Sequence, residues 1–147
     1  MLGALTVYTD GGARGNPGPA AIGIVLCDVD DHVLREHREF IGEATNNEAE
    51  YRALIRGLRL AARHTREEVR CISDSQLLVR QMMGEYRVRD DRLRELFALA
   101  QAGTRGFEKV SFEHRPRLTG RLARADELVN EALDRAVSGE RRAPSSR

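Results

Sequence analysis

The feature that most constrains the fold is a short apolar run that ends on an acid and then enters a glycine-rich segment. From Ala4 to Thr9, apolar and polar side chains alternate with the two-residue period of a β-strand. Asp10 follows at once, and Gly11 and Gly12 then permit the backbone geometry of a tight turn. This pattern predicts a strand that presents one carboxylate at its end. A solvated aspartate before an ordinary turn fits the same residues, so the rest of the chain must decide.

The rest of the chain alternates strand patterns with helix patterns. Apolar runs at 20–26 and 33–41 are joined by an Asp-rich turn, which predicts a hairpin. Thr45 and Glu48 form the capping-box signature of a helix start. The later patterns predict a strand at 69–73, a helix ending at Met83, a helix from Asp90 or Asp91 to Gly103, a strand at 107–112 and a helix at 121–137. We therefore predict an α/β fold, in which helices flank a five-stranded mixed sheet whose first three strands are antiparallel.

Length and composition indicate a single soluble domain. A chain of 147 residues with 41% apolar residues can bury a conventional core, and no apolar run approaches the ~20 residues of a membrane helix. No secretory-signal pattern opens the sequence. Cys27 and Cys71 lie far apart without CxxC spacing, so we expect reduced core thiols and a cytoplasmic location. We expect one domain over residues 1–137 and a disordered tail or linker over 138–147.

The net charge of +1 conceals an uneven distribution of charge along the chain. Residues 1–50 carry three arginines against nine acidic residues, whereas residues 51–147 carry twenty-one basic against fourteen acidic residues. An acidic site beside a basic surface suits a polyanionic substrate. Charged runs also mark ordinary solvated surface, so the distribution alone does not identify a partner.

Four acids stand out by their positions in the predicted elements. Asp10 and Asp74 each follow a strand, Glu50 lies near a helix start, and Asp126 lies at a loop–helix junction. If the two strands are neighbours, their carboxylates meet at one edge of the sheet. Carboxylates brought together raise one another's pKa unless cations neutralise them. Oxygen ligands without His or Cys select Mg²⁺ or Mn²⁺, and a pair of such ions can promote phosphodiester hydrolysis.

The glycine-rich segment could alternatively bind phosphate directly. It lacks the Gly-Lys-Ser/Thr of a P-loop and the compact G-x-G-x-x-G of a dinucleotide fold. A bare carboxylate at its mouth would also repel phosphate, whereas a carboxylate with bound metal would attract it.

Four segments together resemble type 1 ribonuclease H. They are Thr9-Asp10-Gly11-Gly12 with Gly15-Asn16-Pro17-Gly18, Thr45-Asn46-Asn47-Glu48-Ala49-Glu50, Ser73-Asp74-Ser75-Gln76-Leu77 and Ala125-Asp126-Glu127-Leu128, in the family's order over about 120 residues. The resemblance implies a ribonuclease H-like fold and a metal-dependent endoribonuclease. Such an enzyme hydrolyses the RNA strand of RNA/DNA hybrids to 5′-phosphate and 3′-hydroxyl ends.

The resemblance also implies roles for individual residues. Two Mg²⁺ ions, with Mn²⁺ as a possible substitute, would be held by the catalytic acids Asp10, Glu50, Asp74 and Asp126. The hybrid would be contacted by Gly11, Gly12, Asn16, Thr45, Asn46, Asn47 and Gln76, because polar groups in a wide minor groove can recognise 2′-hydroxyls. Simple capping of a helix is an alternative role for Asn46 and Asn47.

The sequence departs from the family pattern in several places. The mobile-loop His found in many members is Pro116 here, which leaves Arg117 and His114 as possible auxiliary or product-release residues. The Asn that commonly precedes the last acid by four residues is Leu122. Only residues 85–89 occupy the place of the family's basic helix, and we expect no N-terminal hybrid-binding domain. We therefore expect a short-form monomer whose hybrid affinity depends strongly on salt, and which can be one part of a longer, fused protein.

Other functions fit the sequence less well. A non-catalytic hybrid-binding module of the same fold would be supported by loss of an acid, yet all four are present. An actin-like phosphotransferase needs a second domain and a second phosphate loop. A 3′–5′ exonuclease would carry Asp-x-Glu at its first motif, where this chain has Gly12.

Overall fold

The computed structural model describes residues 2–142 and is built on one five-stranded sheet in the order β3-β2-β1-β4-β5. The strands β1 (Ala4–Ala13), β2 (Gly18–Cys27) and β3 (Val33–Ala44) are antiparallel neighbours. β4 (Glu68–Ser73) pairs with β1 in parallel, and β5 (Lys109–His114) pairs with β4 in parallel. The predicted mixed sheet with three antiparallel opening strands is confirmed.

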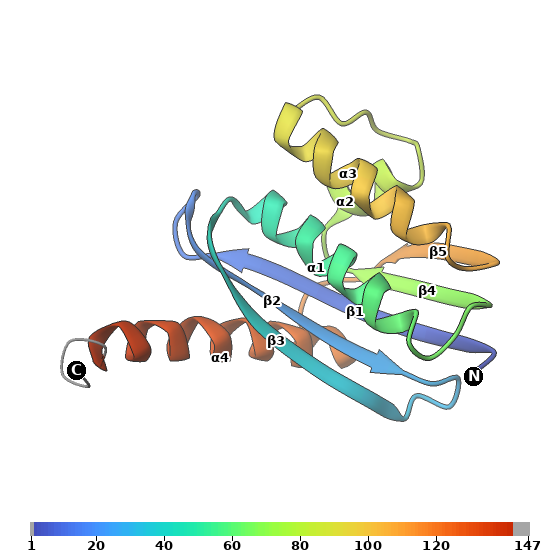
Figure 1. The fold of residues 1–147 in the computed structure, drawn as a ribbon, viewed down its shortest axis with the longest axis horizontal. Coiled ribbons are helices and arrows are strands. Elements are labelled where there is room, and N and C mark those ends of the chain that lie inside the picture. Colours follow the sequence, from blue (N-terminus) through green and yellow to red (C-terminus); the bar gives the residue numbers. More distant parts are fainter. Residues whose placement is uncertain (1, 143–147) are drawn as a thin grey trace.

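Helices cover both faces of this sheet (Figure 1). The helices α1 (Asn46–Ala61), α2 (Gln76–Met82) and α3 (Asp91–Thr104) lie on one face, and α4 (Gly120–Arg142) crosses the other. Because side chains alternate along a strand, β1 sends Val7 to the α1 face and Tyr8 to the α4 face. On β2, Ile24 likewise faces α1 and Val25 faces α4.

The parallel pairing of β1 with β4 places two acids side by side. Thr9 of β1 pairs with Ser73, the last residue of β4, so the next residues, Asp10 within β1 and Asp74 directly after β4, are neighbours. The carboxyl ends of parallel strands open at the same sheet edge. The sheet itself therefore delivers the first two predicted acids to one place.

The start of α1 follows the predicted capping box. The Thr45 hydroxyl accepts a hydrogen bond from the Glu48 N–H, and the Glu48 carboxylate accepts one from the Thr45 N–H. Beside it, Gly11 packs against the helix backbone so closely that a Cβ atom at this position would lie 2.3 Å from the carbonyl carbon of Ala49. Only glycine permits this approach of β1 to α1.

A second close approach fixes α4 on the sheet. A Cβ atom at Gly23 would lie 2.2 Å from the Ala125 carbonyl oxygen, so the backbone of α4 rests directly on β2. The neighbouring contacts are apolar, and Leu122, Ala125 and Leu128 pack against Val25 and Ile72.

Several element boundaries differ from the sequence prediction. α4 continues to Arg142, whereas the sequence predicts a disordered tail from Ser138, where the apolar periodicity ends. Residues 143–147 of the predicted tail lie outside the described residues. Gly103 lies within α3, where its missing side chain admits Leu58, and β5 begins at Lys109 rather than at residue 107.

Cys27 and Cys71 are free and buried, as predicted. Among residues 2–142, none of the helices combines the length and the apolar character that a bilayer span requires.

Candidate active site

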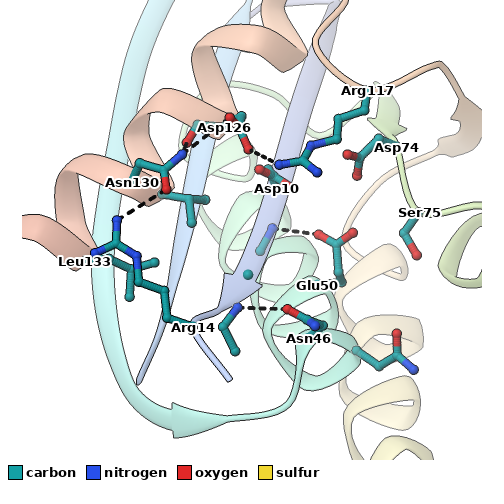
Figure 2. Close-up of a pocket in the computed structure, with 15 residues that line it drawn as sticks. Asp10, Arg14, Asn46, Glu50, Asp74, Ser75, Arg117, Asp126, Asn130 and Leu133 are labelled. Atoms are coloured by element: carbon teal, nitrogen blue, oxygen red, sulfur yellow. Dashed lines mark hydrogen bonds and ion pairs between the residues drawn. The ribbon is translucent and has the colours of Figure 1, made fainter. Parts of the chain in front are cut away.

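Three acids converge beside the carboxyl-terminal half of β1. Asp10 ends the buried part of β1, Asp74 follows β4, and Glu50 comes from the start of α1. One carboxylate oxygen from each lies within 4.8 Å of the others, and Asp10 is only 8% exposed. We call Asp10, Glu50 and Asp74 the carboxylate cluster (Figure 2).

The backbone holds one member of this cluster in place. The Gly11 N–H donates a hydrogen bond of 2.6 Å to Oε1 of Glu50. The close packing of Gly11 on Ala49 brings the donor and the acceptor together. β1 continues through Gly11 and Gly12 to Ala13 and pairs there with β2, so the predicted turn directly after Asp10 is wrong. The backbone of the strand itself orients Glu50.

The carboxylate cluster strongly favours bound protons or cations. Burial, followed by the charges of Asp74 and Asp126, raises the pKa of Asp10 to about 8. Burial and the charges of Asp10 and Asp74 raise the pKa of Glu50 well above its usual value. A set of oxygen ligands that repel one another in this way fits a hard divalent cation such as Mg²⁺ or Mn²⁺, whose charge would stabilise the ionised forms.

Asp126 lies beside the cluster but is held differently. It occupies the second turn of α4 rather than the predicted loop–helix junction, because α4 begins at Gly120. Arg117 donates to its Oδ1 at 3.2 Å, and the Asn130 side chain donates to its Oδ2 at 3.4 Å. Its carboxylate also raises the pKa of Asp10, which places the two acids in the same site.

A cleft of about 480 Å³ contains these four acids. One wall is formed by the last residues of β1 and the start of α1, where the Ala13 N–H donates to the Asn46 side chain at 2.9 Å. The opposite wall is α4 with Arg117 (Figure 2). The residues lining the cleft are Asp10, Gly11, Gly12, Ala13, Arg14, Asn46, Asn47, Glu50, Asp74, Ser75, Arg117, Asp126, Val129, Asn130 and Leu133.

Some predicted substrate residues support the cleft without lining it. Thr45 caps α1, and Asn16 accepts a hydrogen bond of 3.0 Å from the Asn46 N–H. Gln76 and His114 lie elsewhere, since both line a separate hollow between α2 and β5 that also contains Arg80. Gln76 is the first residue of α2 and does not line the cleft of the four acids, although the preceding Ser75 does.

Three polar residues line the cleft although no sequence motif predicts them there: Arg14, Ser75 and Asn130. Asn130 was detectable as the residue one turn after Asp126 on the same helix face. Arg14 gave no local signal, because its contacts on α4 are more than 110 positions away in the sequence.

Comparison with known proteins places this geometry in a family. The family model described as reverse transcriptase-like matches residues 8–132. The chain is 44% identical over 134 residues to ribonuclease HI of Halobacterium salinarum, covering 91% of this chain and 66% of that protein. It is 43% identical to the bifunctional protein Rv2228c of Mycobacterium tuberculosis, covering 90% of this chain and 36% of that protein. The chain thus spans less than two thirds of each of these curated relatives.

Solved structures agree in fold and sequence. The N-terminal RNase H domain of Rv2228c matches with a TM-score of 0.87 and 41% identity, covering 93% of this chain and 98% of that one. LC11-RNase H1, solved in complex with an RNA/DNA hybrid, matches with a TM-score of 0.83 and 46% identity, covering 90% of this chain and 99% of that one. On the shared fold, the matched segment and this level of identity, the chain belongs to the type 1 ribonuclease H family.

Proposed function

We propose that this protein is a metal-dependent endonuclease that hydrolyses the RNA strand of RNA/DNA hybrids, leaving 5′-phosphate and 3′-hydroxyl ends. The observation that carries the proposal is the convergence of Asp10, Glu50 and Asp74 within 4.8 Å in an open cleft. Further support comes from LC11-RNase H1, 46% identical, whose solved structure contains a hybrid.

The four acids are the proposed ligands of two Mg²⁺ ions, which Mn²⁺ could replace. When bound, these ions would activate a water molecule and stabilise the charge on the leaving oxygen of the phosphodiester. The carboxylate cluster provides oxygen ligands from two strands and a helix, so their positions depend on the sheet register. Asp126 would complete the ligand set from α4, where Arg117 and Asn130 orient it.

The walls of the cleft are suited to an RNA-containing duplex. Asn46 and Asn47 line the cleft at the N-terminus of α1, and amides can hydrogen-bond 2′-hydroxyls and base edges in a wide minor groove. Gly12 carries no side chain, so a nucleic-acid backbone can approach β1 closely there, whereas the space beside Gly11 is filled by α1 and only its backbone faces the site. Arg117 supplies a cation next to Asp126 and is the proposed auxiliary residue.

The cleft is built within one chain, which supports the proposal that a monomer acts. A cytoplasmic location stays a prediction that rests on the reduced thiols.

The direct test is cleavage of a labelled RNA/DNA hybrid beside double-stranded RNA and double-stranded DNA. Each substrate is incubated with Mg²⁺, with Mn²⁺ or with a chelator. Cutting of the RNA strand of the hybrid alone, lost with the chelator, is the expected result. Salt-sensitive hybrid binding without any cutting would overturn the proposed activity and favour a non-catalytic hybrid-binding module.

A further inference from the structure

Arg14 reaches from the turn between β1 and β2 to α4, at the edge of the cleft. Its Nη2 donates to Asp134 Oδ1 at 2.7 Å and to Asn130 Oδ1 at 3.4 Å (Figure 2 shows the contact with Asn130). Asn130 in turn donates to Asp126, so a chain of contacts leads from Arg14 to the fourth acid of the site. Asp126, Asn130 and Asp134 are spaced four residues apart and occupy successive turns of one helix face.

The turn that carries Arg14 does not need this ion pair to hold its shape. The Arg14 N–H donates to the Pro19 carbonyl, and the Ala13 N–H donates to Asn46. A Cβ atom at Gly18 would lie 2.3 Å from the Arg14 carbonyl oxygen, so the backbone here is already tightly packed. The side chains of Arg14 and Asp134 are 44% and 69% exposed, and exposed ion pairs contribute little to stability.

The position of Arg14 suits the binding of a polyanion. Among residues 2–142, Arg14 and Arg117 are the two basic side chains that line the cleft, and each is paired with an acid of α4. Asp134 lies two turns beyond Asp126, about 12 Å along the helix axis. A guanidinium at that distance would meet a phosphate on the same strand, roughly two to four nucleotides from the one at the carboxylate cluster.

We propose that Arg14 binds a backbone phosphate of the strand to be cut. In the free protein Asp134 forms an ion pair with the Arg14 guanidinium, and nucleic acid displaces Asp134 from it. This inference rests on the proposed function. A phosphate is a better partner than Asp134, because its oxygens can accept two parallel hydrogen bonds from one guanidinium. Asp134 then acts as an internal competitor that weakens binding of nucleic acid to the free protein.

The test compares the affinity for hybrid of variants at Arg14 and at Asp134, which are expected to change in opposite directions. Variants are made in an Asp10→Asn background in Mg²⁺, so that a fluorescent hybrid stays intact, and affinity is measured over a range of salt concentrations. Arg14→Gln is expected to weaken binding roughly 10-fold and to lower the slope of log affinity against log salt by about 1. Asp134→Asn is expected to tighten binding roughly 2–3-fold. In the enzyme with Asp10 intact, Arg14→Gln should raise KM and leave kcat nearly unchanged.

Two matched variants separate this role from general charge effects. Arg63→Ala removes an exposed cation beyond the far end of α1, and Glu127→Gln removes an exposed acid from α4 outside the cleft. Neither should reproduce the change seen at Arg14 or Asp134. Thermal unfolding of each variant verifies that the fold is retained.

The double variant Arg14→Gln/Asp134→Asn decides the mechanism. The gain from Asp134→Asn should disappear when Arg14 is absent. If the gain persists, Asp134 acts only through long-range repulsion, and the proposed competition is overturned. If both single variants weaken binding, the pair is structural, which also overturns the inference. If the parent protein neither binds nor cleaves the hybrid, the proposed function is wrong. If the parent is active and Arg14→Gln binds the hybrid as tightly as the parent, only this inference is wrong.

Discussion

The carboxylate cluster and Asp126 are parts of one site that are held by different kinds of structure. Asp10, Glu50 and Asp74 are positioned by the parallel register of β1 and β4 and by the Gly11 backbone. Asp126 stands on α4 and is oriented by side chains from Arg117 and Asn130. The positions of three acids are therefore fixed by the backbone, whereas the orientation of the fourth depends on exposed side-chain contacts that other partners can replace.

The largest expected effect comes from removing charge in the cluster. Asp10→Asn should reduce hybrid cleavage about 1,000-fold or more, because a neutral amide is a poor ligand for a divalent cation. Single-turnover cleavage in Mg²⁺ measures the loss, and circular dichroism verifies the fold. Turnover near that of the parent would show that Asp10 is not a metal ligand.

The next largest effect is expected from a substitution that prevents the close approach of β1 to α1. Gly11→Ala forces a Cβ atom to within 2.3 Å of the Ala49 carbonyl carbon, so we expect the free energy of unfolding to fall by about 2–3 kcal/mol and cleavage to fall with it. Gly12→Ala is the matched control, because its Cβ would meet Val129 at an ordinary 3.6 Å. Equal denaturation midpoints for the two variants would refute the role assigned to Gly11.

The metal-free protein should lose stability as the pH rises. The pKa of Asp10 is about 8 in the folded protein against 3.8 for an ordinary Asp, so the folded state binds more protons than the unfolded state between these values. Stability must then fall as pH rises through this range, and we expect a loss of about 1–3 kcal/mol from pH 5 to pH 8 in chelator.

Urea unfolding at the two pH values measures this trend. Asp10→Asn should remove most of it, and Mg²⁺ should reduce it by stabilising the ionised carboxylates. A stability in chelator that is equal at pH 5 and pH 8 would contradict the proposed repulsion within the cluster.

The smallest effect is expected on the α4 side of the site. Arg117→Ala removes one of the two side-chain donors to Asp126, and should lower kcat about 10-fold with little change in KM. Arg117→Lys keeps the charge and should recover part of the rate. If kcat is unchanged in the alanine variant, Arg117 is a surface residue without a role in turnover.

The backbone-set part of the site was predictable from sequence for a physical reason. Asp10 and Asp74 each follow a strand pattern directly, and Thr45 with Glu48 marks the start of the helix that carries Glu50. These signals are local, so neighbouring residues suffice to read them. Placing the acids together needed only the assumption that the two strands are neighbours, which the β1–β4 pairing confirms.

The contacts on α4 were less predictable, because they join residues far apart in the chain. Nothing next to Arg14 in the sequence indicates that it meets Asp134. The place of Gln76 in the hollow with His114, on β5, likewise depends on how distant parts of the chain pack. The apolar periodicity of α4 ends near Val137, whereas the helix continues to Arg142, so its last turn has no apolar pattern from which to predict it.

The contact between Gly23 and the Ala125 carbonyl has a consequence for how such an enzyme can be adjusted. Asp126, Asn130 and Asp134 stand on the same rigid helix, and that helix rests on a residue without a side chain. One methyl group at position 23 would lift all three together, while the carboxylate cluster on the opposite wall stayed in place. Gly23 therefore sets the distance between α4 and the sheet. A single substitution at this position, remote from the carboxylates, would change the width of the cleft that a duplex must enter.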